Sequence, residues 1–185
     1  MSLKLNRRHY LTLALASVTT QLHAQTWPVK PVRLVVPFAP GGSTDVVARM
    51  LGQKLTDIWG QSVVIENRAG AGGNLGADAV AKSAPDGHTL LFASGSITIN
   101  PSIYTNMPFD TVRDLTPITN VASGPMLIVV NDKAPWRNLK DLIQDAKANP
   151  GKINFGSAGI GSQIHLAAEN FADAAGIEIA HVPYK

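Results

Sequence analysis

The stretch VRLVVPFAPGGSTDVVARMLGQKL, residues 32–55, decides the fold. It opens with a short valine-rich apolar run, which is typical of a buried strand. Residues 44–60 then repeat apolar side chains at helical spacing up to Gly60, which ends the predicted helix. The residues expected on its one apolar face are Val46, Val47, Met50, Leu51, Leu55 and Ile58. Between strand and helix lies PGGSTD (40–45), which we call the first glycine loop, and such a turn often binds an anion.

The same alternation continues along the chain. Residues 62–68 and 88–94 are predicted as strands on either side of a helix at 74–85, and an irregular part follows at 99–118. The pattern then restarts, with strands expected at 125–131, 152–159 and 177–184 and helices at 138–149 and 162–176. The prediction is therefore an α/β fold of two lobes with mainly parallel sheets, residues 25–122 and 123–185. Because the last strand has no covering helix after it, we expect the second lobe to be incomplete and the chain to be part of a longer one.

Residues 1–24 have the pattern of a secretory signal peptide. A positive start with Lys4, Arg7 and Arg8 precedes a short apolar run, and cleavage is expected after Ala24. NRRHYL also resembles a twin-arginine signal, so general secretion and the twin-arginine route both stay open. Either route predicts a periplasmic protein.

Charge and cysteine content exclude several functions. The three basic residues of the signal leave 13 Lys and Arg against 13 Asp and Glu, so no basic surface for nucleic acid is expected. The sequence has no cysteine, which excludes disulfides, thiolate metal sites and a cysteine nucleophile. The spacing of His88, His165 and His181 fits no zinc signature, so neither a metal nor a cofactor is predicted.

Two further loops repeat the plan of the first one. AGAGGN (69–74), the second glycine loop, and GSAGIGSQ (156–163), the third, each lie between a predicted strand and a predicted helix. All three belong to the carboxyl ends of parallel strands, where ligands of open α/β sheets bind. No Gly-Lys-Ser/Thr or G-x-G-x-x-G pattern is present, so a carboxylate is favoured over a nucleotide. Asp45, close to the first loop, is either a helix-stabilising residue or a group that would repel the anion.

The motifs PFAPGGSTDVVAR, VVIENRAGAGGNLGAD, DGHTLLFAS, KINFGSAGIGSQIHLAAENF and AHVPYK occur in this order from residue 37 to residue 185. Together they resemble the Bug-type, or TctC-like, extracytoplasmic solute receptors of tripartite tricarboxylate transporters. The resemblance implies a type II periplasmic-binding-protein fold whose lobes close over a small organic carboxylate. It also implies a monomer that delivers this ligand to membrane permease subunits, without catalytic residues.

Carried over to this sequence, the resemblance places ligand contacts in the three glycine loops, at the end of the third strand and on the last strand. The residues are Gly41, Gly42, Ser43, Thr44, Ala71, Gly72, Gly73, Asn74, Ser94, Gly95, Ser96, Ser157, Ala158, Gly161, Ser162, Gln163 and His181, with Tyr184 as a further wall residue. Two alternatives stay open. One is a secreted α/β hydrolase with Ser43 or Ser162 as nucleophile and His165 as base, and the other is a ligand receptor for a membrane sensor.

Overall fold

The computed structural model describes residues 26–184, so the predicted signal peptide lies outside the described residues. The first lobe is built on a parallel three-stranded sheet in the order β2-β1-β3, formed by β1 (Val32–Val36), β2 (Val63–Asn67) and β3 (Thr89–Leu91). In this register Leu34 lies opposite Ile65 on one side and Leu90 on the other. The central strand is the valine-rich run that begins the fold-deciding stretch.

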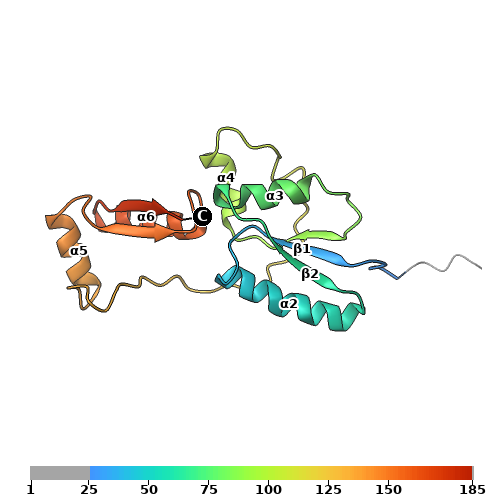
Figure 1. The fold of residues 1–185 in the computed structure, drawn as a ribbon. Coiled ribbons are helices and arrows are strands. Elements are labelled where there is room, and N and C mark those ends of the chain that lie inside the picture. The colour runs from blue at the N-terminus through green and yellow to red at the C-terminus, as the bar shows by residue number, and fades with distance from the viewer. Residues whose placement is uncertain (1–25, 185) are drawn as a thin grey trace, which may run out of the picture.

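The sheet is covered on both faces. Helix α2 (Ser43–Trp59) packs on one face and α3 (Asn74–Ala81) on the other (Figure 1). This double cover explains the continuous apolar character of β1, in which Val32, Val35 and Val36 are fully buried. The predicted β-α-β-α-β order and its parallel pairing are confirmed.

The predicted apolar face of α2 is confirmed only in part. Val47, Leu51 and Leu55 are half-buried, and Leu51 packs on the core cluster. The other three, Val46, Met50 and Ile58, are exposed, whereas Ala48 and Gly52 are buried against the sheet. Small side chains at the centre of this face let the helix axis approach β2 closely, so that a methyl group added at Gly52 would lie 2.9 Å from Ile65 Cδ1.

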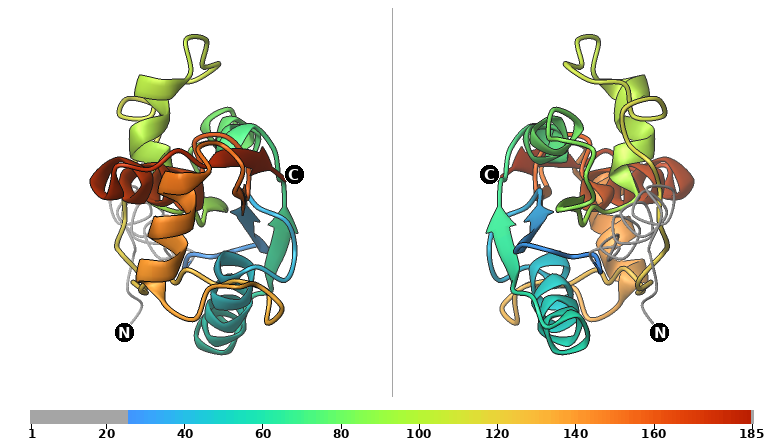
Figure 2. Two further views of the ribbon diagram at one scale, coloured as in Figure 1. Left: turned by 90° about the vertical axis from the view of Figure 1, so that its left-hand side faces the viewer. Right: turned by 90° about the vertical axis from the view of Figure 1, so that its right-hand side faces the viewer.

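The second lobe holds a parallel pair of strands, β4 (Asn154–Ser157) and β5 (Ala180–Pro183), with α5 (Leu139–Ala148) and α6 (Gln163–Ala175). Its apolar cluster centres on Ala146, Ala172 and Ile177. Asn138 caps α5 as predicted, because its side chain accepts the Asp141 amide at 3.1 Å. Figure 2 views the two lobes one behind the other, along the line that joins them.

An extended connection joins the lobes where a strand was predicted at 125–131. That prediction is wrong, since residues 115–130 form no regular element, and Leu127 and Val129 are exposed by 80% and 83%. A strand needs a hydrogen-bonding neighbour, and no strand among residues 26–184 runs beside this segment. None of the helices in that range combines the length and apolar character needed to cross a bilayer.

Two short helices complete the first lobe near the junction. The turn η2 (Ala71–Gly73) leads into α3, and α4 (Ser96–Ile103) follows β3. Gly76 of α3 fixes this region, because a methyl group there would lie 2.7 Å from Pro37 Cβ and 2.9 Å from Pro37 Cα. The helix thus packs directly on the residues that precede the first glycine loop.

Two glycine-to-alanine substitutions test this packing. Gly76→Ala should lower the free energy of unfolding by about 1–3 kcal/mol, because the methyl group meets the backbone of Pro37. Gly52→Ala is the matched control, since its contact is the rotatable end of Ile65 and alanine raises helix propensity by up to ~1 kcal/mol. Urea unfolding of both variants measures the difference, and equal losses would contradict this account of α3.

Candidate functional site

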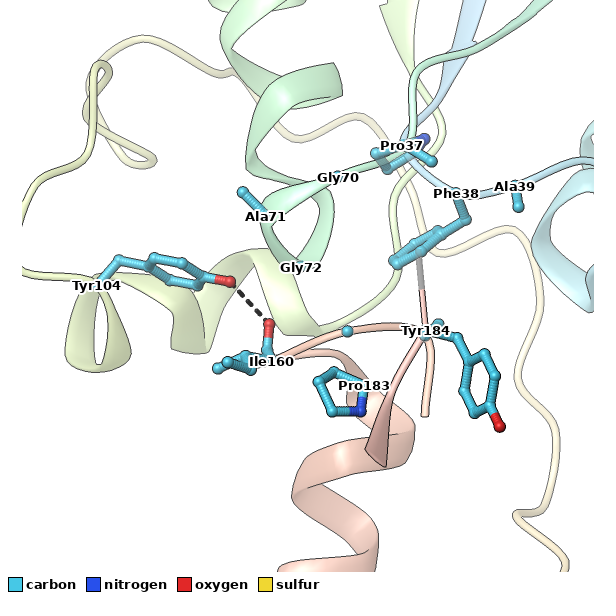
Figure 3. A pocket seen from close by; sticks show the side chains of 13 residues that line it. Pro37, Phe38, Ala39, Gly70, Ala71, Gly72, Tyr104, Ile160, Pro183 and Tyr184 are labelled. Carbon is cyan, nitrogen blue, oxygen red and sulfur yellow. Dashed lines mark hydrogen bonds between the residues drawn. The ribbon is translucent and has the colours of Figure 1, made fainter. Parts of the chain in front are cut away.

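A cavity of about 280 Å³ lies where the two lobes meet, at the carboxyl ends of the strands (Figure 3). Its walls come from the ends of β1, β2, β4 and β5 and from the residue after α4. The lining residues are Pro37, Phe38, Ala39, Ala69, Gly70, Ala71, Gly72, Tyr104, Ala158, Gly159, Ile160, Pro183 and Tyr184. This position is the one that open parallel sheets use for ligands.

The second glycine loop has an unusual backbone. Four consecutive residues, Gly70 to Gly73, have positive φ angles, and Ala71 among them adopts φ 48° although it carries a side chain. That conformation is sparsely populated for non-glycine residues, and such strain is common at binding sites. As the first residues of η2, Ala71 and Gly72 have amides without an acceptor inside the turn. The loop therefore lines the cavity with strained glycine-rich backbone.

Asn100 holds the second loop from behind. This fully buried side chain donates its amide hydrogens to the Gly72 carbonyl at 3.2 Å and to Asn74 Oδ1 at 2.8 Å. Asn74 is thereby turned away from the cavity lining, and α3 begins without a side-chain cap. The polar side chains behind this loop thus stabilise its shape.

The second and third glycine loops contact each other directly. Tyr104 Oη donates a hydrogen bond to the Ile160 carbonyl at 2.8 Å, drawn as a dashed line in Figure 3. A methyl group at Gly72 would lie 2.3 Å from the same carbonyl oxygen, and one at Gly161 would lie 3.0 Å from Asn100 Oδ1. The two lobes therefore approach as closely as they do because both positions are glycine.

The first glycine loop already holds a carboxylate, that of Asp45. This buried side chain accepts hydrogen bonds from Arg49 Nε and the Gly41 amide, both at 2.9 Å, and from Asn67 Nδ2 at 2.8 Å. These bonds, with Arg49 first, keep the pKa of Asp45 well below its usual range. Asp45 therefore stabilises the first loop, and Gly41 to Thr44 lie outside the cavity lining.

The third glycine loop is supported by a serine and two histidines. Ser157 Oγ and His181 Nε2 are hydrogen-bonded at 2.6 Å, and the Gly159 amide donates to the same Oγ at 3.1 Å. The His181 ring stacks on both Phe155 and His165, with ring centroids 4.9 and 4.0 Å away. Burial, and secondly the neighbouring His165, lower the pKa of His181, while Glu169 raises it.

The hydrolase alternative needs Ser43 or Ser162 as nucleophile and His165 as base. In the structure the side chains of Ser162 and His165 accept backbone amides of the third loop and the start of α6 instead. Ser162 caps α6, accepting the backbone amide of His165 at 3.3 Å, and its side chain is fully buried. The His165 ring nitrogen Nδ1 accepts the Gly161 amide at 3.2 Å. Within residues 26–184, no three His, Asp or Glu side chains are grouped in a way that would hold a metal ion.

The structure brings three of the predicted contact residues, Ala71, Gly72 and Ala158, into the cavity lining, together with Tyr184. The others lie in the same loops or behind them. These are Gly41, Gly42, Ser43, Thr44, Gly73, Asn74, Ser94, Gly95, Ser96, Ser157, Gly161, Ser162, Gln163 and His181. Ser94 and Ser96 bond to each other at 2.8 Å, and a methyl group at Gly95 would reach within 4.0 Å of Gln163 Nε2, so these two predicted segments also face each other across the lobes.

Sequence reasoning missed the apolar wall. Phe38 lies two residues before the first glycine loop, and its apolar character favoured the core, on which it packs while it also lines the cavity. Tyr104 lies in a segment without clear periodicity, so no local signal marked it as a partner of the third glycine loop.

A family model described as "Tripartite tricarboxylate transporter family receptor" matches residues 47–185. Protein BugT of Bordetella pertussis (strain Tohama I) is 43% identical over 175 residues, which are 94% of this chain and 54% of BugT. A protein from the tcbD-tcbE intergenic region of Pseudomonas sp. (strain P51) is 41% identical over 97% of this chain and 54% of its own length. The chain spans about half the length of the curated relatives it matches.

Solved structures give the same fold. The periplasmic binding protein BugD superposes with a TM-score of 0.79 at 38% identity, over 86% of this chain and 53% of BugD. An R. palustris protein solved with adipate reaches 0.77 at 38% identity, over 86% and 54% of the two chains. MatC from Rhodopseudomonas palustris, solved with bound malate, reaches 0.76 at 30% identity, over 85% and 54%. The predicted periplasmic-binding-protein fold is therefore confirmed.

The contact between the loops predicts the effect of a single methyl group. Gly72→Ala should increase the radius of gyration measured by small-angle X-ray scattering, because the methyl group displaces Ile160 and separates the lobes. Gly60→Ala is the matched control, with a similar φ of 66° but no atom within 4 Å of the new methyl group. Both variants should lose about 1–2 kcal/mol of stability from the left-handed backbone. An unchanged radius for Gly72→Ala would contradict the contact.

The lowered pKa of His181 predicts that the protein loses stability in mild acid. Its pKa lies below the usual 6.5 in the folded state, so the unfolded chain takes up a proton first as the pH falls. The contribution of His181 to the free energy of unfolding should therefore be fully present above pH 7. It should decline as the pH drops below 6.5, until His181 is protonated in the folded state too. NMR titration of the His181 ring and thermal melts at pH 7.5 and 5.5 measure this. In His181→Gln the decline should shrink, and a decline of the same size would point to another group.

Proposed function

The chain belongs to the tripartite tricarboxylate transporter receptor family, and on that premise we propose that it is a solute-binding protein for a small organic carboxylate. It is exported to the periplasm through residues 1–24, by general secretion or the twin-arginine route. There it binds its ligand as a monomer between lobes 25–122 and 123–185 and presents it to the permease subunits of a membrane transporter. No chemical change of the ligand is part of this role.

The observation that carries the proposal is the position of the cavity. It lies between the lobes, at the carboxyl ends of strands from both sheets. Two solved structures of the same fold, at 38% and 30% identity, hold adipate and malate. A small dicarboxylate or monocarboxylate also matches the volume of about 280 Å³, which leaves room for one compact ligand.

Backbone groups would hold the carboxylate. The strained second glycine loop presents the amides of Ala71 and Gly72, and the third loop lies opposite at Ala158. Hydrogen bonds to a charged group contribute about 1.5–3 kcal/mol each, and micromolar affinity needs about 8 kcal/mol. A small number of such bonds, together with burial of the ligand's carbon atoms, is therefore sufficient for micromolar affinity without a basic side chain.

The polar groups behind the loops have supporting roles in this proposal. Ser157 and His181 bond to each other and to Gly159, which keeps the third loop in place. Asp45 does the same for the first loop. These pairs act on the shape of the site, and relatives in the family are receptors rather than enzymes.

Two measurements test the proposal: binding of a carboxylate by the chain, and loss of that binding when a bulky side chain fills the cavity. A thermal-shift screen against mono-, di- and tricarboxylates should find an acid that stabilises the chain by about 2.7 kcal/mol at a hundredfold excess over its Kd. Ala158→Phe should weaken that acid at least tenfold, because Ala158 is an exposed residue of the cavity wall. Ala148→Phe, at the exposed end of α5, is the control. If no acid stabilises the unsubstituted chain, the proposal fails.

A further inference from the structure

The cavity lining contains no charged side chain among the residues that the structure describes. Prolines, alanines, glycines, Ile160 and aromatic rings form nearly all of it. The only side-chain polar atoms are the hydroxyls of Tyr104 and Tyr184, and Tyr104 Oη already donates its hydrogen to Ile160. Apart from these two hydroxyls, the side chains at the cavity are therefore apolar.

Apolar rings line the cavity on both lobes. Phe38 lies beside the second glycine loop, because a methyl group at Gly73 would lie 3.6 Å from its ring. In Figure 3 the rings of Pro183 and Tyr184 lie across the cavity from Gly70 and Ala71, and the Tyr184 hydroxyl points outward. Pro37 at the base is buried. A ligand whose carboxylate meets the second-loop amides would place its far end against these rings.

Among residues 26–184, two arginines of the first lobe close to the glycine loops are paired within that lobe. Arg49 is bound to Asp45 and to Asn67 Oδ1, and Arg68 is paired with Glu66. A second carboxylate at the apolar wall would thus lose its water without gaining an ionic partner. Burial of an unpaired charge is among the most costly changes in a binding site.

From this lining we infer that the site selects acids with a single carboxylate joined to an apolar body, and discriminates against acids that carry a second carboxylate at the far end. The inference rests on the proposed function, because it assumes that the cavity between the lobes is the ligand site. It separates this chain from the relative solved with adipate, which has a carboxylate at both ends.

Three acids of graded structure test the inference by calorimetry on the 185-residue chain. Hexanoate and adipate differ only in the second carboxylate, and hexanoate should bind at least tenfold more tightly. Butyrate lacks two methylene groups, and each methylene buried at the wall should raise affinity about fourfold, so hexanoate should bind roughly 15-fold more tightly than butyrate. If adipate binds as tightly as hexanoate, the inference is wrong while the proposed function stands. If none of the screened acids binds, the proposed function fails.

Arginine substitutions in the cavity lining test the preference for hexanoate over adipate independently. Ala39→Arg should narrow or reverse the preference for hexanoate, because Ala39 is an exposed residue of the lining and the new guanidinium can pair with the second carboxylate. Tyr184→Arg, at a site exposed by 65%, repeats the test from the opposite lobe. Ala148→Arg on α5 is the control for net charge. If the first two variants bind adipate no better than the control does, the cavity is not the selective site and the inference is overturned.

Discussion

Close approach between the backbones of Gly72 and Ile160 is the constraint on which the site depends. A side chain at either glycine of this contact, Gly72 or Gly161, would occupy space that the other lobe fills. The contact in turn needs the second glycine loop in its positive-φ conformation, which Asn100 maintains through Gly72 and Asn74. One buried amide side chain therefore links the conformation of a loop to the distance between two lobes.

Two carboxylates near the glycine loops are paired with groups of their own lobe. Asp45 accepts hydrogen bonds from the Gly41 amide and the Arg49 guanidinium. Glu66 forms salt bridges with Arg33 and Arg68. An anion-binding loop of the expected kind is thus present at the first position, but an internal carboxylate occupies it. The second loop, AGAGGN, contains no acidic residue, and Asp78 in the helix after it pairs with Lys82.

Local patterns predicted the fold well and the site only in part. The run 32–60 dictated a strand, a turn and a helix, and the repeat of that unit implied parallel strands. The face of α2 depended instead on how closely the helix approaches β2, which is a property of the contact and not of the helix. The segment 125–131 had the composition of a strand but lacks a neighbour. Tyr104 reaches Ile160 across 56 residues, and periodicity carries no information about a contact at that separation.

The balance between open and closed lobes follows from how little joins them. Among residues 26–184 one hydrogen bond, from Tyr104 to Ile160, crosses between the lobes, and an extended connection links them along the chain. A single neutral hydrogen bond has a net contribution of about 0.5–1.5 kcal/mol, which is close to the thermal energy. A ligand that contacts both lobes would add several times that amount to the closed state alone. Within residues 26–184 the arrangement of the lobes therefore rests on this one hydrogen bond and on the close packing of Gly72 against Ile160.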